Sequence, residues 1–328
     1  MKSNFYLFKS GQLKRKDHSV VPETKEETIL IPVEQIDSLF YFGEIAVNKR
    51  LLELFNRYKI EIVFFNYYGT NIGRFCPCQY GIGKLLLEQV HCYEDEKKRL
   101  TVSQAIQKAS LHNCLAVLEY YHKNGVSLEK QIASLKKVIS EADDVSTVEE
   151  MLLLEARAKK DYYSAFDILL ENTDFIFNRR SYQPPENEMN SLMCFGYHLL
   201  YAVVLKELDM SRLYPEIAFI HSDIRKGPGL HFDLADVYKP FIIDRMIFRM
   251  VRKHKLHLTD FEPTEKGIYL NTEIQKSFVA EFDQELLKTD KVDGKNYTRT
   301  SIIRKDIHSL TAYIEGKIDK PRFFLMKW

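Results

Sequence analysis

The stretch Phe75-Cys76-Pro77-Cys78-Gln79-Tyr80-Gly81-Ile82-Gly83 separates two parts of the chain that differ in the spacing of apolar residues. Before it, apolar and polar residues mostly alternate, which is the period of half-buried strands, with one helical spacing over 47–58. After it the period is about 3.6, which predicts helices. The proline and glycines of the stretch favour a connection. We therefore expect an α+β fold: a small β-rich N-terminal domain over 1–75, a hinge over 76–83, and a mostly α-helical domain over 84–328.

Several segments of the second part have helical spacing, and one of them begins with a cap that can be read from the sequence. Thr147 and Glu150 have the spacing of a capping box, in which a hydroxyl and a carboxylate bind the first N–H groups of a helix. The expected helices cover 84–92, 95–123, 127–141, 147–171, 189–208, 238–255 and 273–288.

The composition is that of an ordinary folded protein. Of 328 residues, 45% are hydrophobic and 28% charged, and this length suits two domains with a core each. We expect no membrane span, because no apolar run is long enough and the first residues lack a signal-peptide core. Five cysteines without a disulfide spacing favour the reducing cytoplasm. The net charge of +1 does not indicate nucleic acid, although a neutral chain can carry a local basic groove.

An acidic residue, Glu155, lies inside the apolar helical run Met151-Leu152-Leu153-Leu154-Glu155-Ala156. Carboxylates are rarely buried without a partner, so Glu155 is a candidate site residue. Lys159 and Tyr162 follow close to the same helical face. The alternative is a half-exposed helix in which Glu155 forms an ordinary ion pair.

A second group of polar residues begins at His221. Gly227-Pro228-Gly229 interrupts the chain, so that His221 can fold back towards the acids that follow. Asp233 and Asp236 share a face if a helix begins there. Helix capping is the alternative, and it accounts for Asp233 better than for Asp236. Carboxylates with one imidazole suit Mg²⁺ or Mn²⁺ rather than structural zinc.

Arginines repeat along the segment 241–255. Arg245, Arg249 and Arg252 recur at helical spacing, and apolar residues take the other side. A solvated basic face and a stripe that binds DNA phosphates are both compatible with this pattern.

Three blocks of sequence resemble one known family. Glu155-Ala-Arg-Ala-Lys-Lys-Asp-Tyr162-Tyr163 is similar to a Glu-Gly-x-x-Ala-x-x-Tyr-Phe helix. The second block contains Asn178-Arg179-Arg180, Pro184-Pro185, Asn190-Ser191-Leu192 and Phe195-Gly196-Tyr197. The third contains Leu213-Tyr214-Pro215, Phe219-Ile220-His221 and the run from Phe232 to Pro240. In this order the blocks resemble CRISPR-associated protein one, the spacer-acquisition endonuclease and integrase family. Residues 31–37 and Phe42-Gly43 extend the likeness over most of the chain.

The resemblance implies that the helical domain is catalytic. It implies that Glu155, His221 and Asp236 bind Mg²⁺ or Mn²⁺, with Asp233 as a supporting acid and Tyr162 where the family keeps a tyrosine. The chain departs from the family pattern where Asp236 replaces the commoner Glu, Ala156 a Gly, Gln183 an Arg and Asn187 an Asp. None of these changes removes an implied metal ligand.

The implied reaction inserts short foreign DNA into a CRISPR array, as part of antiviral defence. A 3′-hydroxyl of the incoming DNA attacks a phosphodiester at the repeat boundary. The implied partners are double-stranded DNA, a second copy of this chain, and the small CRISPR-associated protein two. Two alternatives stay open: a metal nuclease that hydrolyses branched DNA, and a non-catalytic DNA-architectural subunit. The candidate DNA contacts are Arg179, Arg180, Arg225, Lys226, Lys239, Arg245, Arg249 and Arg252.

Overall fold

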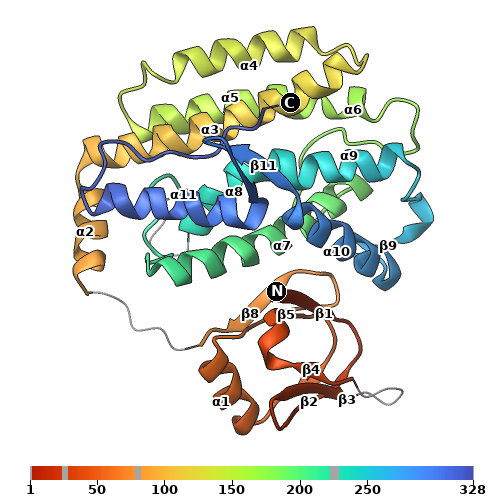
Figure 1. The fold of residues 1–328 in the computed structure, drawn as a ribbon. Helices are drawn as coiled ribbons and strands as arrows, with labels where there is room; N and C mark the ends of the chain where they lie inside the picture. The colour runs from red at the N-terminus through yellow and green to blue at the C-terminus, as the bar shows by residue number, and fades with distance from the viewer. Residues whose placement is uncertain (1, 24–28, 78–82, 222–228, 328) are drawn as a thin grey trace. The chain divides into compact units, whose positions relative to one another are not determined.

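A computed structural model of the protein describes residues 2–23, 29–77, 83–221 and 229–327. A β-rich N-terminal region is followed by a mostly helical region, which confirms the expected fold class (Figure 1). By their internal contacts the residues form two compact units. The first is Met1–Tyr80 with Leu270–Asp283, and the second is Gly81–Tyr269 with Gln284–Trp328.

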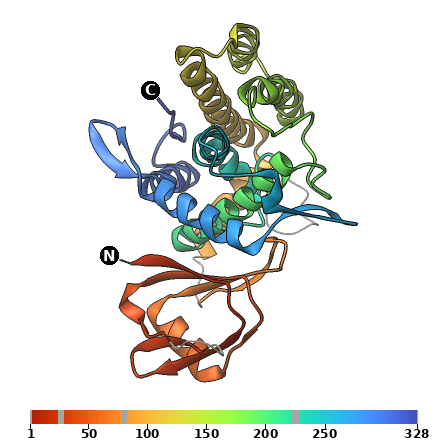
Figure 2. The same ribbon diagram turned by 90° about the vertical axis from the view of Figure 1, so that its right-hand side faces the viewer.

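Strands form most of the first unit, and Figure 2 shows them from a second side. In chain order its N-terminal elements are β1 (Ser3–Leu7), β2 (Gly11–Lys16), β3 (Ser19–Glu23), β4 (Ile31–Pro32), the 3₁₀ turn η1 (Val33–Gln35), β5 (Ile36–Tyr41), β6 (Ile45–Ala46), α1 (Lys49–Tyr58), β7 (Glu61–Phe65) and β8 (Asn71–Phe75). One sheet has the order β1-β5-β7-β8, with β1, β5 and β7 parallel and β8 antiparallel to β7. The other sheet has the order β4-β3-β2-β6.

One hydrophobic core joins both sheets and α1. Leu13 and Val20 come from one sheet, Leu39 and Ile62 from the other, and Phe55 from α1. All are buried, as the alternation of apolar residues along the strands predicts.

The segment Leu270–Asp283 groups with the first unit, which the expected division at 75 and 83 did not include. Gln275 donates a hydrogen bond to the Tyr67 carbonyl at 3.0 Å. Asp283 accepts one from the Tyr6 hydroxyl at 3.3 Å. Helical periodicity shows that a segment has an apolar face, but it does not show which core that face joins.

The second unit is mostly helical, and Figure 2 shows several of its helices nearly end-on. The remaining elements of the chain are α2 (Gly83–Glu94), α3 (Glu96–Lys123), α4 (Glu129–Glu141), α5 (Val148–Ser164), α6 (Phe166–Leu169), α7 (Glu188–Ser211), α8 (Leu230–Tyr238), the π-helix η3 (Lys239–Asp244), α9 (Arg245–Arg252), the 3₁₀ turn η4 (Leu258–Asp260), the paired strands β9 (Phe261–Thr264) and β10 (Gly267–Leu270), α10 (Thr272–Leu287), the hairpin β11 (Thr289–Val292) and β12 (Lys295–Thr298), and α11 (Arg299–Ile314).

Helix α3 packs against α4, α5 and α8, while α7 packs against α8 and α11. This arrangement places α5 and α8 on the same central helix. Helix α7 is long and apolar enough to cross a membrane by length and composition, but 78% of that stretch is buried inside the structure, as in the core helix of a folded protein.

The prediction of one regular helix over 238–255 was wrong in two respects: where the helix starts, and that it is regular throughout. Helical structure begins at Leu230 and widens into a π-helix over Lys239–Asp244, in which the Arg245 N–H donates to the carbonyl of Pro240. Both faces of α8 are largely buried, so its sequence lacks the one-sided apolar pattern of a surface helix. The cap expected at Thr147 is present: its hydroxyl accepts the Glu150 N–H at 3.1 Å.

Candidate active site

Helices α5 and α8 and the segment that ends at His221 carry the three residues expected to form the site. Glu155 lies on α5 and Asp236 on α8. Burial raises the pKa of Glu155, and the negative charge of Asp236 raises it further. The charges of Asp236 and Glu155 also contribute to the raised pKa of His221. The three side chains therefore share one electrostatic environment.

Asp233 holds the segment that carries His221. Its buried carboxylate accepts hydrogen bonds from the backbone N–H groups of Phe219 at 2.8 Å, Ile220 at 2.9 Å and His221 at 3.1 Å. It also contacts Nδ1 of the His221 ring at 2.8 Å. The alternative that Asp233 caps its own helix is therefore wrong, because its carboxylate binds a preceding segment rather than the start of that helix.

The hydrogen bond from His221 to Asp233 is the largest cause of a raised imidazole pKa. Burial acts in the opposite direction, and the negative charges nearby bring the pKa of His221 to about 9. The ring is 42% exposed, so it is bound on one side and accessible on the other. A carboxylate on Nδ1 fixes the ring and directs its chemistry to Nε2.

Asp236 is ionised and paired with a lysine from the π-helix. Burial disfavours its charge, but the charges of Lys239 and Lys159 and the hydrogen bond from Lys239 lower the pKa of Asp236 to about 2. The Lys239 ammonium binds Oδ1 of Asp236 and lies 4.9 Å and 4.8 Å from the ring centres of Tyr197 and Tyr201. Lys239, expected from the sequence as a DNA contact, thus lies within the site itself.

An ion pair of Glu155 was the alternative to a site role. Within the described residues no ion pair is formed at its carboxylate, although the charge of Lys159 lowers its pKa. The Lys159 ammonium instead lies 3.4 Å from the Ser110 hydroxyl. In the described part of the chain, no three His, Cys, Asp or Glu side chains are arranged to hold a metal ion.

A buried acid that the sequence did not single out, Asp244, lies at the end of the π-helix. Its carboxylate accepts hydrogen bonds from the hydroxyls of Tyr197 at 2.7 Å and Tyr162 at 3.0 Å. Burial raises the pKa of Asp244 to about 6, although both hydroxyls and Lys159 act against this. Tyr162 is itself buried, so its contact with Asp244 gives it a positioning role. A single acid in the apolar run Phe241-Ile242-Ile243-Asp244 was the available signal.

The candidate DNA contacts fall into different environments. Arg179 is exposed and paired with Glu186, whereas Arg180 is half-buried and bonded to Asn190 and Cys194. Arg225 and Lys226 lie outside the described residues.

The arginines of α9 also have partners within the second unit. Arg245 stacks on the Tyr120 ring at 4.5 Å, and Arg249 pairs with buried Glu285. Arg252 is exposed and donates to the Leu169 carbonyl at 3.2 Å. Because of these contacts, the arginines of α9 do not form the solvated basic face that was one interpretation of their spacing.

Comparison with known proteins gives one consistent family. The family model described as CRISPR associated protein Cas1 matches residues 5–284. The chain is 35% identical to a CRISPR-associated endonuclease Cas1 of Thermodesulfovibrio yellowstonii, over 100% of both chains. It superposes on a Cas1 protein structure from Thermotoga maritima with a TM-score of 0.86 and 31% identity, covering 99% of this chain and 100% of that one.

A structure titled as a Cas6-RT-Cas1–Cas2 complex shares the fold. Its TM-score is 0.86 at 16% identity, and the match covers 100% of this chain and 36% of that one. The match over residues 5–284 and the full-length relative decide the assignment: this chain belongs to the Cas1 family of CRISPR-associated endonucleases and integrases.

Proposed function

We propose that the protein is a metal-dependent DNA integrase that inserts short foreign DNA into a CRISPR array. One observation carries the proposal: Glu155, His221 and Asp236 share one electrostatic environment, with His221 held by Asp233, in a chain of the Cas1 family. The family membership gives the class of reaction. The shared electrostatics and the donor chemistry of the three side chains support their choice as the site residues.

The donor chemistry of these residues fits Mg²⁺ or Mn²⁺. Two carboxylates and one imidazole are ligands that such cations accept. The charge of Asp236 raises the pKa of Glu155, so the two anions repel one another, and a cation bound by both would relieve that repulsion. A divalent cation held by these residues would lower the pKa of an attacking hydroxyl and neutralise charge on a phosphate.

The chain's own groups have complementary roles. Protonated His221 would lose its proton when its ring binds a cation, so cation binding should release a proton near neutral pH. Lys239 neutralises Asp236, and its ammonium would be available for a phosphate oxygen if a metal ion bound Asp236 in its place. Asp233 and Asp244 keep His221 and Tyr162 in fixed positions.

The proposed partners are double-stranded DNA, the small CRISPR-associated protein two and a second copy of this chain. The fold is shared with 36% of a chain in the Cas6-RT-Cas1–Cas2 complex, which supports the second partner. Both ends of a short duplex must be joined, which requires two active subunits. Arg179 and Arg252 are the exposed cations among the described DNA candidates. At Arg180 and Arg249 a phosphate would have to replace an existing contact. We also propose a cytoplasmic location, on the cysteine pattern alone.

A joining assay with labelled short duplex DNA and a repeat-bearing plasmid tests the proposed function. Wild-type protein with Mg²⁺ or Mn²⁺ should give covalently joined plasmid, and Glu155→Ala or His221→Ala should abolish joining. Glu155→Ala should leave the melting temperature nearly intact, whereas His221→Ala should lower it below about pH 9, because the ion pair with Asp233 is lost. Half-buried Glu155 and exposed His221 contribute little to the core, so their removal should not unfold the protein.

The products separate this proposal from its alternatives. Cleavage of branched DNA without joining would support the hydrolytic nuclease. DNA binding without any metal-dependent turnover would support the architectural subunit. Full joining activity in purified Glu155→Ala would overturn the assignment of the site.

A further inference from the structure

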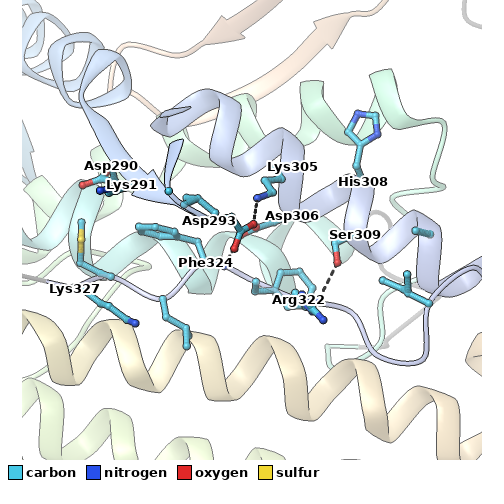
Figure 3. Close-up of a pocket in the computed structure, with 17 residues that line it drawn as sticks. Asp290, Lys291, Asp293, Lys305, Asp306, His308, Ser309, Arg322, Phe324 and Lys327 are labelled. Carbon is cyan, nitrogen blue, oxygen red and sulfur yellow. Dashed lines mark hydrogen bonds and ion pairs between the residues drawn. The ribbon is translucent and has the colours of Figure 1, made fainter. Parts of the chain in front are cut away.

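The segment 321–327, here called the C-terminal strap, contacts α11, α3 and the π-helix η3. Phe324 and Met326 of the strap are buried, and the Phe324 ring lies 5.3 Å from the ring of Phe241 in the π-helix. The N–H of Arg322 donates to the Ser309 hydroxyl on α11 at 2.8 Å, which fixes the start of the strap (Figure 3).

Asn113 on α3 connects the strap to α8. Its fully buried amide group donates to the carbonyl of Val237 at 2.8 Å and to the carbonyl of Phe324 at 3.0 Å. Its carbonyl oxygen accepts the N–H of Met326 at 2.7 Å. Both amide hydrogens and the oxygen are therefore used, two of them by the strap and one by the residue that follows Asp236.

Asp306 on α11 makes a second connection between the same two segments. Its Oδ2 atom accepts the N–H of Phe324 at 2.8 Å and the hydroxyl of Tyr238 at 3.0 Å. Asp306 is largely buried and is one of the residues that line an open pocket of about 880 Å³ between the β11–β12 turn, α11 and the strap (Figure 3). Asn113 and Asp306 thus hold consecutive residues of α8, Val237 and Tyr238, against one strap.

The contacts of Asn113 and Asp306 with α8 lie close to Asp236 along the helix. They hold the last turn of α8, immediately before the chain widens into the π-helix at Lys239. Such π-turns inside a helix are frequent at functional sites. Asp236 lies in the turn that is held, and Lys239 begins the wide one.

We propose that the C-terminal strap, through Asn113 and Asp306, sets the position of Asp236 relative to Glu155 and His221, so that Asn113 and Asp306 are positioning residues for cation binding. This inference rests on the proposed function. Groups that orient metal ligands from outside the site change metal affinity by roughly 10–100-fold when they are removed.

Mn²⁺ binding to the purified, DNA-free protein tests the inference without reference to catalysis. The titration compares the wild type with Asn113→Ala, with a chain ending at residue 321, and with Asp306→Ala and Asp306→Asn. Asn113→Ala, the shortened chain and Asp306→Ala should each weaken Mn²⁺ binding at least about tenfold. Asp306→Asn should bind nearly as the wild type does, because an amide oxygen can still accept both hydrogen bonds.

Leu135→Ala is the matched control for general loss of stability. Leu135 is fully buried on α4, so its truncation should lower the melting temperature without weakening Mn²⁺ binding. All titrations are made below the melting temperature of each variant. If Asn113→Ala does not fold, the shortened chain, which retains Asn113 and its contact with Val237, tests the same inference.

The outcomes separate this inference from the proposed function. Loss of Mn²⁺ binding in Glu155→Ala, with full retention in Asn113→Ala and in the shortened chain, would overturn the role of the strap alone. Equal loss in Asp306→Asn and Asp306→Ala would also count against positioning by these hydrogen bonds. Mn²⁺ binding that Glu155→Ala leaves unchanged would overturn the proposed site and the role of the strap together.

Discussion

At the scale of single residues, the pair formed by His221 and Asp233 makes stability depend on pH. The hydrogen bond to Asp233 raises the pKa of His221 from its usual 6.5 to about 9. The folded protein therefore binds this proton more tightly than the unfolded chain. The resulting stabilisation is fully present below pH 6.5 and is lost as the pH rises through about 9. His221→Gln should lower the melting temperature of metal-free protein more at pH 6 than at pH 9.5.

His198 on α7 supplies a control of opposite sign. Burial lowers the pKa of His198 to about 4, so the folded protein disfavours its protonation. As the pH falls below 6.5 the wild type should lose stability relative to His198→Gln. Thermal melts in the presence of a chelator check both variants. A His221→Gln effect that is the same at every pH would contradict the assignment of the raised pKa to the folded state.

Substitution of Asp233 tests the role of the same pair in the joining reaction. Asp233→Asn keeps an oxygen for backbone N–H groups but removes the charge that orients the His221 ring. Joining should fall by roughly 10–100-fold, the usual effect of losing a group that orients a ligand. The pKa of His221, followed by NMR, should fall in the same variant. A large drop in joining with an unchanged His221 pKa would assign another role to Asp233.

The sequence identified some of these residues and missed others for physical reasons. Glu155 was visible because an acid in an apolar helical run is unusual, and the family blocks then selected His221 and Asp236. Asp244 was missed as a site residue, because its partners, Tyr162 and Tyr197, are 82 and 47 positions away along the chain. No local pattern reports hydrogen bonds between such distant side chains.

At the scale of elements, the arginines of α9 have separable roles. Arg249 binds Glu285, a buried carboxylate that Arg299 and Lys288 also bind. Arg249→Ala should cost about 1.5–3 kcal/mol of stability, the range for a hydrogen bond to a charged group. It should leave the salt dependence of DNA affinity unchanged, because its guanidinium is already engaged.

Arg252 is the matched comparison on the same helix. It is exposed, donates a hydrogen bond to the Leu169 carbonyl, and lies 5.7 Å from the centre of the Tyr121 ring. Arg252→Ala should cost less stability and should flatten the slope of log affinity against log salt by about 0.9, the value for one phosphate contact. Affinities for a short duplex across a salt series measure both slopes. A flattened slope in Arg249→Ala but not in Arg252→Ala would reverse these roles.

Most of the expected helices lie close to their observed bounds, and α8 is an exception. Helix α3 and the strands around the first core follow their expected periods closely. Helix α8 was expected to begin eight residues too late, at 238 rather than at Leu230. Its acids, Asp233 and Asp236, lie at positions that burial would normally give to apolar residues. The polar residues proposed to form the site therefore interrupt the apolar periodicity from which the helix that carries them could have been predicted.

At the scale of the whole molecule, the sequence predicted two parts, but it did not predict that a late segment of the chain belongs to the first part. The first unit includes Leu270–Asp283, which lies far along the chain from the N-terminal strands. Helix α10 then continues to Glu285, which Arg249 and Arg299 bind in the second unit. Which core a late helix joins depends on distant contacts, and no spacing within α10 encodes them.

The proposed need for two active subunits gives a prediction for the assembled protein. If each subunit joins one end of a short duplex, mixing wild type with Glu155→Ala should reduce two-ended products more steeply than one-ended products, because a two-ended event needs both subunits active. Glu155 lies on the half-buried face of α5, so the variant should still assemble with wild-type subunits. The measurement is the ratio of two-ended to one-ended joined DNA across a series of mixing ratios, after the subunits have been allowed to exchange.

A heat-unfolded preparation of the wild type, added in place of the Glu155→Ala protein, controls for simple dilution of active subunits. With it, both products should fall only as the concentration of active protein falls. A ratio of two-ended to one-ended joining that stays constant as Glu155→Ala is added would mean that one subunit joins both ends in turn. The requirement for a second copy would then rest on DNA binding rather than on a second active site.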